Sequence, residues 1–529
     1  MFFDANKIGE KIISADLCIV GGGAAGITIA NKFADTGVSV VLLESGGDTM
    51  DRETEKLNSN ASVTGEPYMM AASRLRFFGG TTNHWSGRCF RFRDHDFTAM
   101  GGPEIVGWPI SLKDVSGYYQ RAAELALFQS KPVEWSPDYW RKRFGTPAWP
   151  IDPKLFPVRT ECFARPHADT GNRTYAAYRK PLDTAKNVRV IQYANVTELI
   201  ENPDRSAIEE AKVRTLAGTE FTVKARVFVV ATGGMENPRL LLASRRRSDA
   251  GIGNNHDQVG RYFTDHVRIL QDFVRNPANQ PDDRVNFTEV PGDDMFVFNH
   301  YLLSDDVLDK ERLDSVLFRF RTVYAKSDGV AAASRLAGGV ASGDMSQVTS
   351  DDLGLAIGNL GDIAAHATDR LYCHSEPITY LMSATVDPAP IADSRITLRP
   401  ELDAVGMPMI NLHWSIPENT RHSMHRALQL FGQEAGRSGA GRLRLTFDPK
   451  KPWSSVTGFV CGNHHTGTTR MSDDPKTGVV DRSCRVHGVS NLFMAGSSVF
   501  PTVGGGSTTM MITALALRLA DHLKQEHFA

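Results

Sequence analysis

The stretch from Asp16 to Phe33, which reads DLCIVGGGAAGITIANKF, constrains the fold more than any other part of the chain. A short apolar run ends in three glycines and continues into residues spaced as in a helix, which predicts a buried strand, a tight turn and a helix. Val38 to Leu43 predicts a second buried strand, which completes a β-α-β unit. The expected fold class is therefore α/β, with a Rossmann-type parallel sheet.

The turn of this unit has the pattern G-x-G-x-x-G, which suits a dinucleotide. The first glycine permits the turn, the second lets backbone N–H groups approach a pyrophosphate, and the third lets helix and strand pack closely. The helix N-terminus adds partial positive charge, and the acidic residue that closes the second strand can accept from ribose hydroxyls. The glycines that follow this acidic residue favour FAD over NAD. The predicted cofactor contacts here are Gly21, Gly23, Ala24, Ala25, Gly26, Glu44 and Ser45.

The composition excludes several classes of protein. The formal net charge of −2 gives no basic excess for a nucleic-acid surface. None of the six cysteines stands in a C-x-x-C pair, so no metal site is predicted. The N-terminus lacks the apolar core of an export signal, and no run of about 18 apolar residues could cross a bilayer. We therefore expect a soluble, cytoplasmic protein with no membrane partner.

The sequence predicts two domains that alternate along the chain. Val227 to Val230 is another apolar run that ends in small residues. Leu492 to Ala495 is a third, followed by glycines and a long apolar helix from Thr508 to Leu523. The segment from Lys326 to Ala367 predicts a helical insertion, a lid or a mobile segment. Residues 1–110, 188–275 and 453–529 are assigned to a cofactor-binding domain, and residues 111–187 and 276–452 to a substrate-binding domain.

Further motifs surround this framework. In chain order they are FGGTTNHWSGR (78–88), VVATGGMENPRLLL (229–242), VGRYFTDHV (259–267), NHHTGTTRM (463–471) and NLFMAGSSVFPT (491–502). With the opening glycines, they resemble the glucose–methanol–choline (GMC) oxidoreductase family, closest to its branch of pyranose oxidases and sugar dehydrogenase flavoproteins. The resemblance implies bound FAD and oxidation of an alcohol to a carbonyl. It also implies a Rossmann-type FAD-binding domain and a second α+β domain on a mostly antiparallel sheet.

The resemblance also implies the catalytic residues. In the family, the histidine of H-x-x-G-T-x-R-M lies over the flavin, and this pattern assigns the proton-abstracting base to His464. An imidazole titrates near neutrality, which suits a general base. His465 is expected to point away from the reacting atoms. The family's second active-site residue is usually Asn or His, whereas this sequence has Ser507, which can hydrogen-bond an alcohol but is no general base.

Residues that contact the flavin follow from the same resemblance. His84 matches a position that carries a covalent flavin bond in some relatives and packs near the dimethylbenzene ring in others, and both remain open. Val196 is expected to bind the adenine through its backbone, and the helix that starts near Thr508 to direct its positive end toward the flavin. The full set is Gly79, Gly80, Thr82, Asn83, His84, Val196, Ala231, Gly233, Gly496, Ser497 and Thr508.

The predicted function is FAD-dependent oxidation of an alcohol group of a sugar, polyol or glycoside. The expected partners are this small-molecule alcohol and dioxygen or another electron acceptor, and a homo-oligomer is left open. The departure at Ser507 motivates an alternative, a flavoenzyme of secondary metabolism that acts on a non-sugar alcohol or performs redox-neutral lyase chemistry. Two further alternatives are a non-catalytic nucleotide-binding protein and an NAD-dependent dehydrogenase. The last is the weakest, because a releasable coenzyme does not explain the closing glycine-rich segment.

Overall fold

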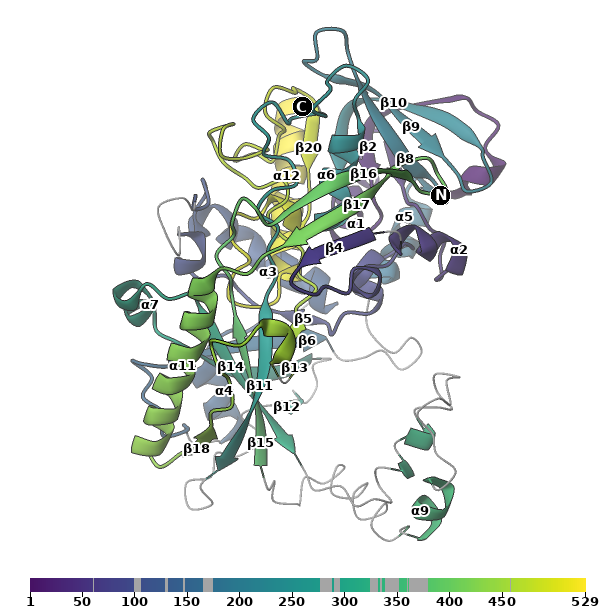
Figure 1. Cartoon of the computed structure of the whole chain (residues 1–529). Helices are drawn as coiled ribbons and strands as arrows, with labels where there is room; N and C mark the ends of the chain where they lie inside the picture. Colours follow the sequence, from purple (N-terminus) through teal and green to yellow (C-terminus); the bar gives the residue numbers. More distant parts are fainter. Residues whose placement is uncertain are drawn as a thin grey trace.

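A computed structural model shows two large β-sheets with helices packed around them (Figure 1). It describes residues 1–59, 61–98, 106–128, 132–145, 148–164, 175–275, 288–289, 295–323, 332–333, 335–337, 352–358, 360, 379–456 and 458–529. Most of the segment from Lys326 to Ala367 lies outside these residues, so its three predicted alternatives stay open.

The first sheet is parallel over most of its width, which confirms the predicted fold class. Its order is β1 (Phe2–Asp4), β7 (Val188–Gln192), β3 (Val40–Leu43), β2 (Ile12–Val20), β10 (Glu220–Val230), β9 (Ile208–Arg214) and β8 (Asn195–Glu201), with β20 (Leu492–Met494) also on β10. Among its described strands, only the β10–β9 and β9–β8 pairings are antiparallel. The apolar runs predicted near both ends of the chain thus belong to one sheet, because β10 pairs with both β2 and β20.

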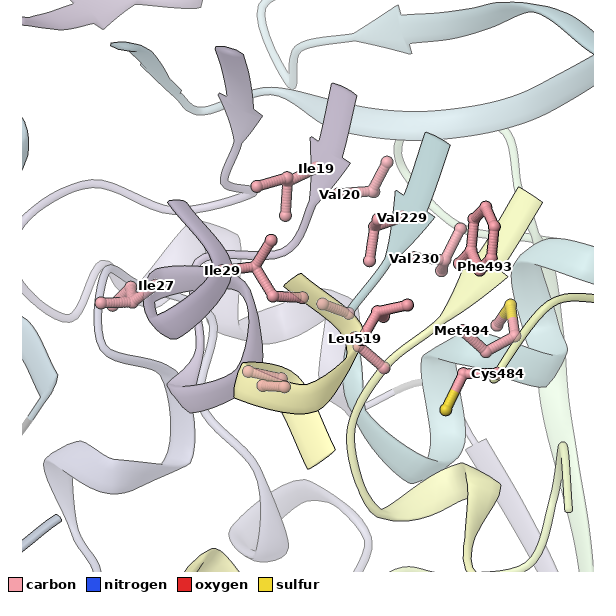
Figure 2. Packing of buried hydrophobic residues seen from close by; sticks show 14 of the residues in the cluster. Ile19, Val20, Ile27, Ile29, Val229, Val230, Cys484, Phe493, Met494 and Leu519 are labelled. Atoms are coloured by element: carbon pink, nitrogen blue, oxygen red, sulfur yellow. The ribbon is translucent and has the colours of Figure 1, made fainter. Parts of the chain in front are cut away.

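The N- and C-terminal segments also share one core. Helix α1 (Ala24–Phe33) follows β2 and packs against α12 (Thr509–His527). In Figure 2, Ile29 of α1, Val229 of β10 and Leu519 of α12 meet in one apolar cluster. Within the described ranges, no helix has the length and apolar character that a bilayer span needs. The other helices are α2 (Arg52–Glu55), α3 (Leu112–Leu127), α4 (Pro137–Phe144), α5 (Arg179–Thr184), α6 (Gly233–Ala243), α7 (Asp305–Glu311), α9 (Asp352–Gly358) and α11 (Glu418–Arg437).

The second sheet is antiparallel, as predicted for the substrate side. Its order is β18 (Gly441–Arg444), β11 (Val267–Arg275), β15 (Thr379–Val386), β14 (Val316–Val323), β13 (Met295–Leu302), β6 (Val158–Ala164) and β5 (Arg88–Cys89), with β12 (Thr288–Glu289) on β13 and β19 (Val460–Cys461) on β11. Helix α11 packs on β14, β15 and β18, and Phe431 of this helix meets Phe318 at a ring distance of 4.8 Å. A small sheet of β16 (Arg395–Leu402), β17 (Pro408–Trp414) and β4 (Ala61–Gly65) lies between the two large ones (Figure 1).

Three strands of the second sheet come from segments that the sequence assigned to the cofactor-binding domain. They are β5, β11 and β19, and they pair with β6, β15 and β11, respectively. The chain therefore crosses between the two sheets at more points than the predicted segments allow. The domain boundaries themselves stay a prediction.

Candidate functional site

A cavity of about 720 Å³ lies between the carboxyl ends of the parallel strands and one face of the second sheet. Open α/β sheets bind their ligands at this edge, so the cavity is the candidate site. Most of the residues predicted from the sequence line it. They are Gly21, Gly23, Ala24, Ala25, Glu44, Ser45, Gly80, Thr82, His84, Val196, Ala231, Gly233, His464, Gly496, Ser497, Ser507 and Thr508.

Three predicted cofactor residues, Gly26, Gly79 and Asn83, are absent from this lining and support it instead. A Cβ atom at Gly26 would lie 1.9 Å from the carbonyl oxygen of Gly21, so only glycine lets α1 pack this close to β2. Gly79 has a φ of 97°, which favours glycine. Asn83 Nδ2 donates to the carbonyl of Gly80 at 2.9 Å and so holds the turn in place.

Glu44 lies buried at the carboxyl end of β3, where it orders the glycine turn. Its Oε2 accepts from the N–H of Gly22 at 2.7 Å, and its Oε1 accepts from the N–H of Gly46 at 2.9 Å. Burial raises the pKa of Glu44, although these two hydrogen bonds oppose the rise. A carboxylate has about four acceptor positions, so Glu44 can also accept from ribose hydroxyls.

Several buried polar atoms of the cavity wall have no hydrogen-bond partner within the described part of the chain. They include Asn195 Oδ1, Arg74 Nε and His465 Nε2. An unpaired buried polar atom costs about 1–3 kcal/mol, so these atoms indicate that a ligand supplies their partners. Arg74 and Arg76 both pair with Glu236, at 2.5 and 2.9 Å, so two guanidinium groups share one carboxylate in this wall. The residues present therefore fit an anionic dinucleotide cofactor.

His464 is held by a loop that pairs with the segment just before β11. Thr264 and Thr466 form an antiparallel bridge, and their N–H groups donate across it at 3.2 and 3.1 Å. The buried carboxylate of Asp265 accepts from the N–H groups of Asn463 and His464 at 2.9 and 2.8 Å. These contacts fix the backbone at His464, which is half-buried and lines the cavity.

A chain of hydrogen bonds connects His464 to a buried carboxylate. His266 Nε2 lies 2.7 Å from the carbonyl oxygen of Gly504 and 3.0 Å from Asp387 Oδ1. Both neighbours are acceptors, so His266 carries a hydrogen on Nε2. His266 Nδ1 lies 2.7 Å from His464 Nδ1, and a neutral His266 therefore accepts from the Nδ1–H of His464. His464 Nε2 is then left as an acceptor, and no described residue hydrogen-bonds to it.

The surrounding charges act differently on the two imidazoles. Burial would lower the pKa of His266, but the carboxylates of Asp387 and Asp265 and the carbonyl of Gly504 together outweigh it, and the pKa is raised. Burial holds the pKa of His464 well below its ordinary value, and the positive charges of His266 and Arg319 add to this effect. A proton shared by the pair is therefore more stable on His266 than on His464.

His465 lines the cavity but takes no part in this chain. Its ring centroid lies 5.6 Å from that of Tyr68 and 6.1 Å from that of Phe263, and Ser497 Oγ donates to its carbonyl at 2.6 Å. Burial lowers the pKa of His465 to about 3. His465 is therefore neutral near pH 7 and packs between aromatic rings.

Ser507 lines the cavity, but its hydroxyl is already engaged. Ser507 Oγ donates to the carbonyl of Arg88 at 2.8 Å. A hydroxyl has a single hydrogen, so Ser507 in this geometry can accept from a substrate but cannot donate to it. The hydrogen bond also ties β5 to the segment that leads into α12. A role of Ser507 in substrate binding stays a prediction.

Asp265, His266 and His464 form the kind of cluster that can hold a metal ion, since one ligand-type atom of each lies within 4.8 Å of the others. Two nitrogens bound at about 2.0 Å to a tetrahedral zinc ion would lie about 3.3 Å apart. The Nδ1 atoms of the two histidines are 2.7 Å apart, which is a hydrogen-bond distance. Asp265 also accepts from the Tyr68 hydroxyl at 2.6 Å. The geometry is that of a hydrogen-bonded cluster.

Several residues that line or support the cavity were not identified from the sequence. Asp265 and His266 stand in the motif VGRYFTDHV, which carried the family resemblance, but a role for them could not be assigned without their contacts. Asp387 stands in no recognised motif. Three arginines that line the cavity, Arg88, Arg268 and Arg319, also come from separate strands of the second sheet. The pairing of these strands is what brings them together.

Two family models described as GMC oxidoreductase match this chain, one over residues 144–268 and the other over residues 390–516. The fructose dehydrogenase large subunit of Gluconobacter japonicus is 24% identical, over 97% of this chain and 98% of that protein. The 6'''-hydroxyparomomycin C oxidase of Streptomyces lividus is 25% identical, over 97% and 93%. A solved structure of Aspergillus oryzae RIB40 formate oxidase, which concerns the effect of a mutation on FAD modification, is similar with a TM-score of 0.58 at 18% identity, over 98% of this chain and 100% of the other.

Proposed function

Because this chain belongs to the GMC oxidoreductase family and is an FAD-dependent enzyme, we propose that it oxidises an alcohol group of a sugar, polyol or glycoside to a carbonyl. The sugar class is supported by relatives whose names specify fructose and an aminoglycoside as substrates. The observation that carries the proposal is the chain from His464 through His266 to Asp387 at the wall of the cavity.

His464 Nε2 is the proposed acceptor of the hydroxyl proton. The network leaves a lone pair on this nitrogen, and the low pKa of His464 keeps the ring neutral before the reaction. A base positioned in this way contributes about 10²- to 10⁴-fold to the rate. FAD, held by the glycine turn and Glu44, would supply the acceptor for the hydride of the carbinol carbon.

His266 and Asp387 are proposed to stabilise the proton once it has been transferred. A proton that arrives at His464 Nε2 makes its Nδ1–H more acidic, and this hydrogen faces the Nδ1 of His266 at 2.7 Å. The proton is more stable on His266, because Asp387 lies 3.0 Å from the Nε2 of that ring. The arrangement thus follows the logic of a base oriented by a second group and a buried carboxylate.

The test is anaerobic mixing of the purified flavoprotein with sugars and polyols while the flavin absorbance near 450 nm is followed. We expect a sugar or polyol to bleach the flavin. His464→Ala should slow bleaching by about 10²- to 10⁴-fold without loss of bound flavin. His422→Ala, at an exposed histidine outside the cavity lining, is the matched control. Unchanged bleaching in His464→Ala would contradict the assignment of the base, and turnover without bleaching would favour the lyase alternative.

A further inference from the structure

One face of the second sheet supplies both the proton-handling residues and a group of arginines. His266 immediately precedes the β11 strand and Arg268 is its second residue, and both line the cavity, as expected for side chains two residues apart on extended backbone. Arg268 is the register partner of Thr385 on β15, and Thr385 is also the partner of Leu317 on β14. The cavity-lining residues of this face are His266, Arg268, Leu317, Arg319, Thr385 and Asp387.

Three guanidinium groups, from Arg88, Arg268 and Arg319, gather at this end of the cavity. Arg319 Nη2 lies 3.1 Å from Glu161 Oε1, and Arg88 Nη1 lies 3.8 Å from Glu161 Oε2. Burial lowers the pKa of Arg319 to about 10, and Arg88 and Arg268 contribute to this fall while Glu161 opposes it. The arginines are therefore close enough to repel one another.

Two other carboxylates at this end of the cavity belong to Asp387 and Asp265. Asp387 pairs with His266, and Asp265 accepts hydrogen bonds from Tyr68 and from two backbone N–H groups. Around Glu161, by contrast, the guanidinium groups of Arg88 and Arg319 share a single carboxylate, so guanidinium groups are in excess at this part of the wall. A neutral substrate gains little from such a concentration, whereas a carboxylate or phosphate makes strong, often bidentate hydrogen bonds with arginine.

We propose that the alcohol substrate carries an anionic group, a carboxylate or a phosphate ester, which Arg268 and Arg319 bind, with Arg88 beside them. Arg268 lies two residues from His266, about 7 Å along the strand. The anionic group is then separated from the carbinol carbon by several bonds, as in a uronic acid or a sugar phosphate. This inference rests on the proposed function, since it names the substrate class of the same site.

The test compares D-glucose, D-glucuronate and D-glucose 6-phosphate as reductants of the enzyme-bound flavin. We expect at least one of the two anionic sugars to exceed glucose by about 10- to 100-fold in kcat/KM. Raised ionic strength should lower kcat/KM for the anionic sugar only. The two anionic sugars distinguish a carboxylate site from a phosphate site.

Substitutions of Arg268 test whether this residue produces the preference for an anionic sugar. Arg268→Gln should remove most of the preference for the anionic sugar, mainly through KM, and Arg268→Lys should restore part of it. Arg444→Gln changes an exposed arginine of the same sheet, paired with Asp272 at 3.7 Å outside the cavity lining, and should leave the preference unchanged. A preference that survives in Arg268→Gln would overturn the inference, and so would an equal rate with glucose.

A binding measurement separates this inference from the proposed function. Inorganic phosphate and D-glucuronate are titrated into the holoenzyme while the flavin difference spectrum is recorded. If none of the sugars bleaches the flavin, the proposed sugar oxidation fails, yet saturable binding of either anion that is lost in Arg268→Gln still supports the anion site. If glucose bleaches the flavin and neither anion binds, the proposed function stands and the anion site is refuted.

Discussion

The substitution Asp387→Asn tests the proposed role of the buried carboxylate. Asparagine has nearly the same shape as aspartate but no charge, so the packing around His266 is preserved. The carbonyl of Gly504 still accepts from His266 Nε2, at 2.7 Å in the wild type. The protonation pattern of the two imidazoles should therefore survive, and the variant isolates the contribution of the charge.

The expected magnitude follows from the positions of the three groups. The Asp387 carboxylate lies 3.0 Å from His266, whose other nitrogen lies 2.7 Å from His464. With a separation of about 7 Å and an effective dielectric constant of about 20, Coulomb's law gives about 2 kcal/mol for stabilisation of a proton on His464. This corresponds to a fall of about 30-fold in the rate of flavin reduction. A change of protonation pattern would cost far more, about 10⁴-fold in the Ser-His-Asp hydrolases.

The same variant should also change the pH profile. Protonation of His266 puts a hydrogen on its Nδ1, which forces His464 to accept at Nδ1 and blocks Nε2 as a base. Activity is therefore lost as the pH falls through the pKa of His266. Asp387 raises that pKa against burial, so its removal should move the acid limb to lower pH. The other charged groups near this pair, Asp265, Arg268 and Arg319, are unchanged in the variant.

The assay is stopped-flow measurement of flavin reduction between about pH 5 and pH 9 under anaerobic conditions. Asp314→Asn is the matched control, because Asp314 is also a buried, hydrogen-bonded aspartate but lies outside the cavity lining. The reasoning is refuted if Asp387→Asn keeps both the wild-type rate and the wild-type acid limb. A lower rate with an unshifted limb would assign Asp387 a purely structural role.

Three further changes have defined outcomes. Glu44→Gln should weaken FAD binding by about 10- to 100-fold, because two backbone N–H groups lose a charged acceptor, and flavin release on dialysis measures this. His465→Gln should leave the acid limb in place, because a group whose pKa is about 3 stays neutral over the measured range, and a shifted limb would show that the limb belongs to His465. Burial raises the pKa of Asp314 to about 6, so its contribution to stability is present below about pH 4 and is lost as the pH rises through 6. Asp314→Asn should remove this fall of about 3 kcal/mol in unfolding free energy, as thermal melts across that range would show.

Local sequence patterns predicted the strands, turn and helix that form the glycine-rich side of the cavity. The glycine turn, its two strands and the C-terminal helix follow from the spacing of apolar and small residues, and β2, β3 and α12 lie close to the predicted positions. The presence of β20 in the same sheet as β2 was also predictable, because β20 has the composition of a buried parallel strand. The family resemblance is confirmed by the two matching family models.

The partners of His464 could not be predicted, because they depend on pairings between distant segments. His266 stands 198 residues before His464 in the chain. Asp387 lies beside His266 because β15 pairs with β11 in one particular register. A single sequence carries no signal for such a register. The same holds for Ser507, whose hydroxyl is engaged by Arg88, a residue 419 positions away.

The register of β11 couples the proposed base to the proposed anion site. His266 and Arg268 face the cavity because they are two residues apart, and a slip of one residue would turn both toward the opposite face. The pairing of Arg268 with Thr385, and of Val267 with Val386, fixes that register. A substitution that disturbs this pairing should therefore reduce proton transfer and anion binding together. Substitutions at His266 or Arg268 alone should separate the two effects, since His266 acts through His464 and Arg268 on the proposed anionic group.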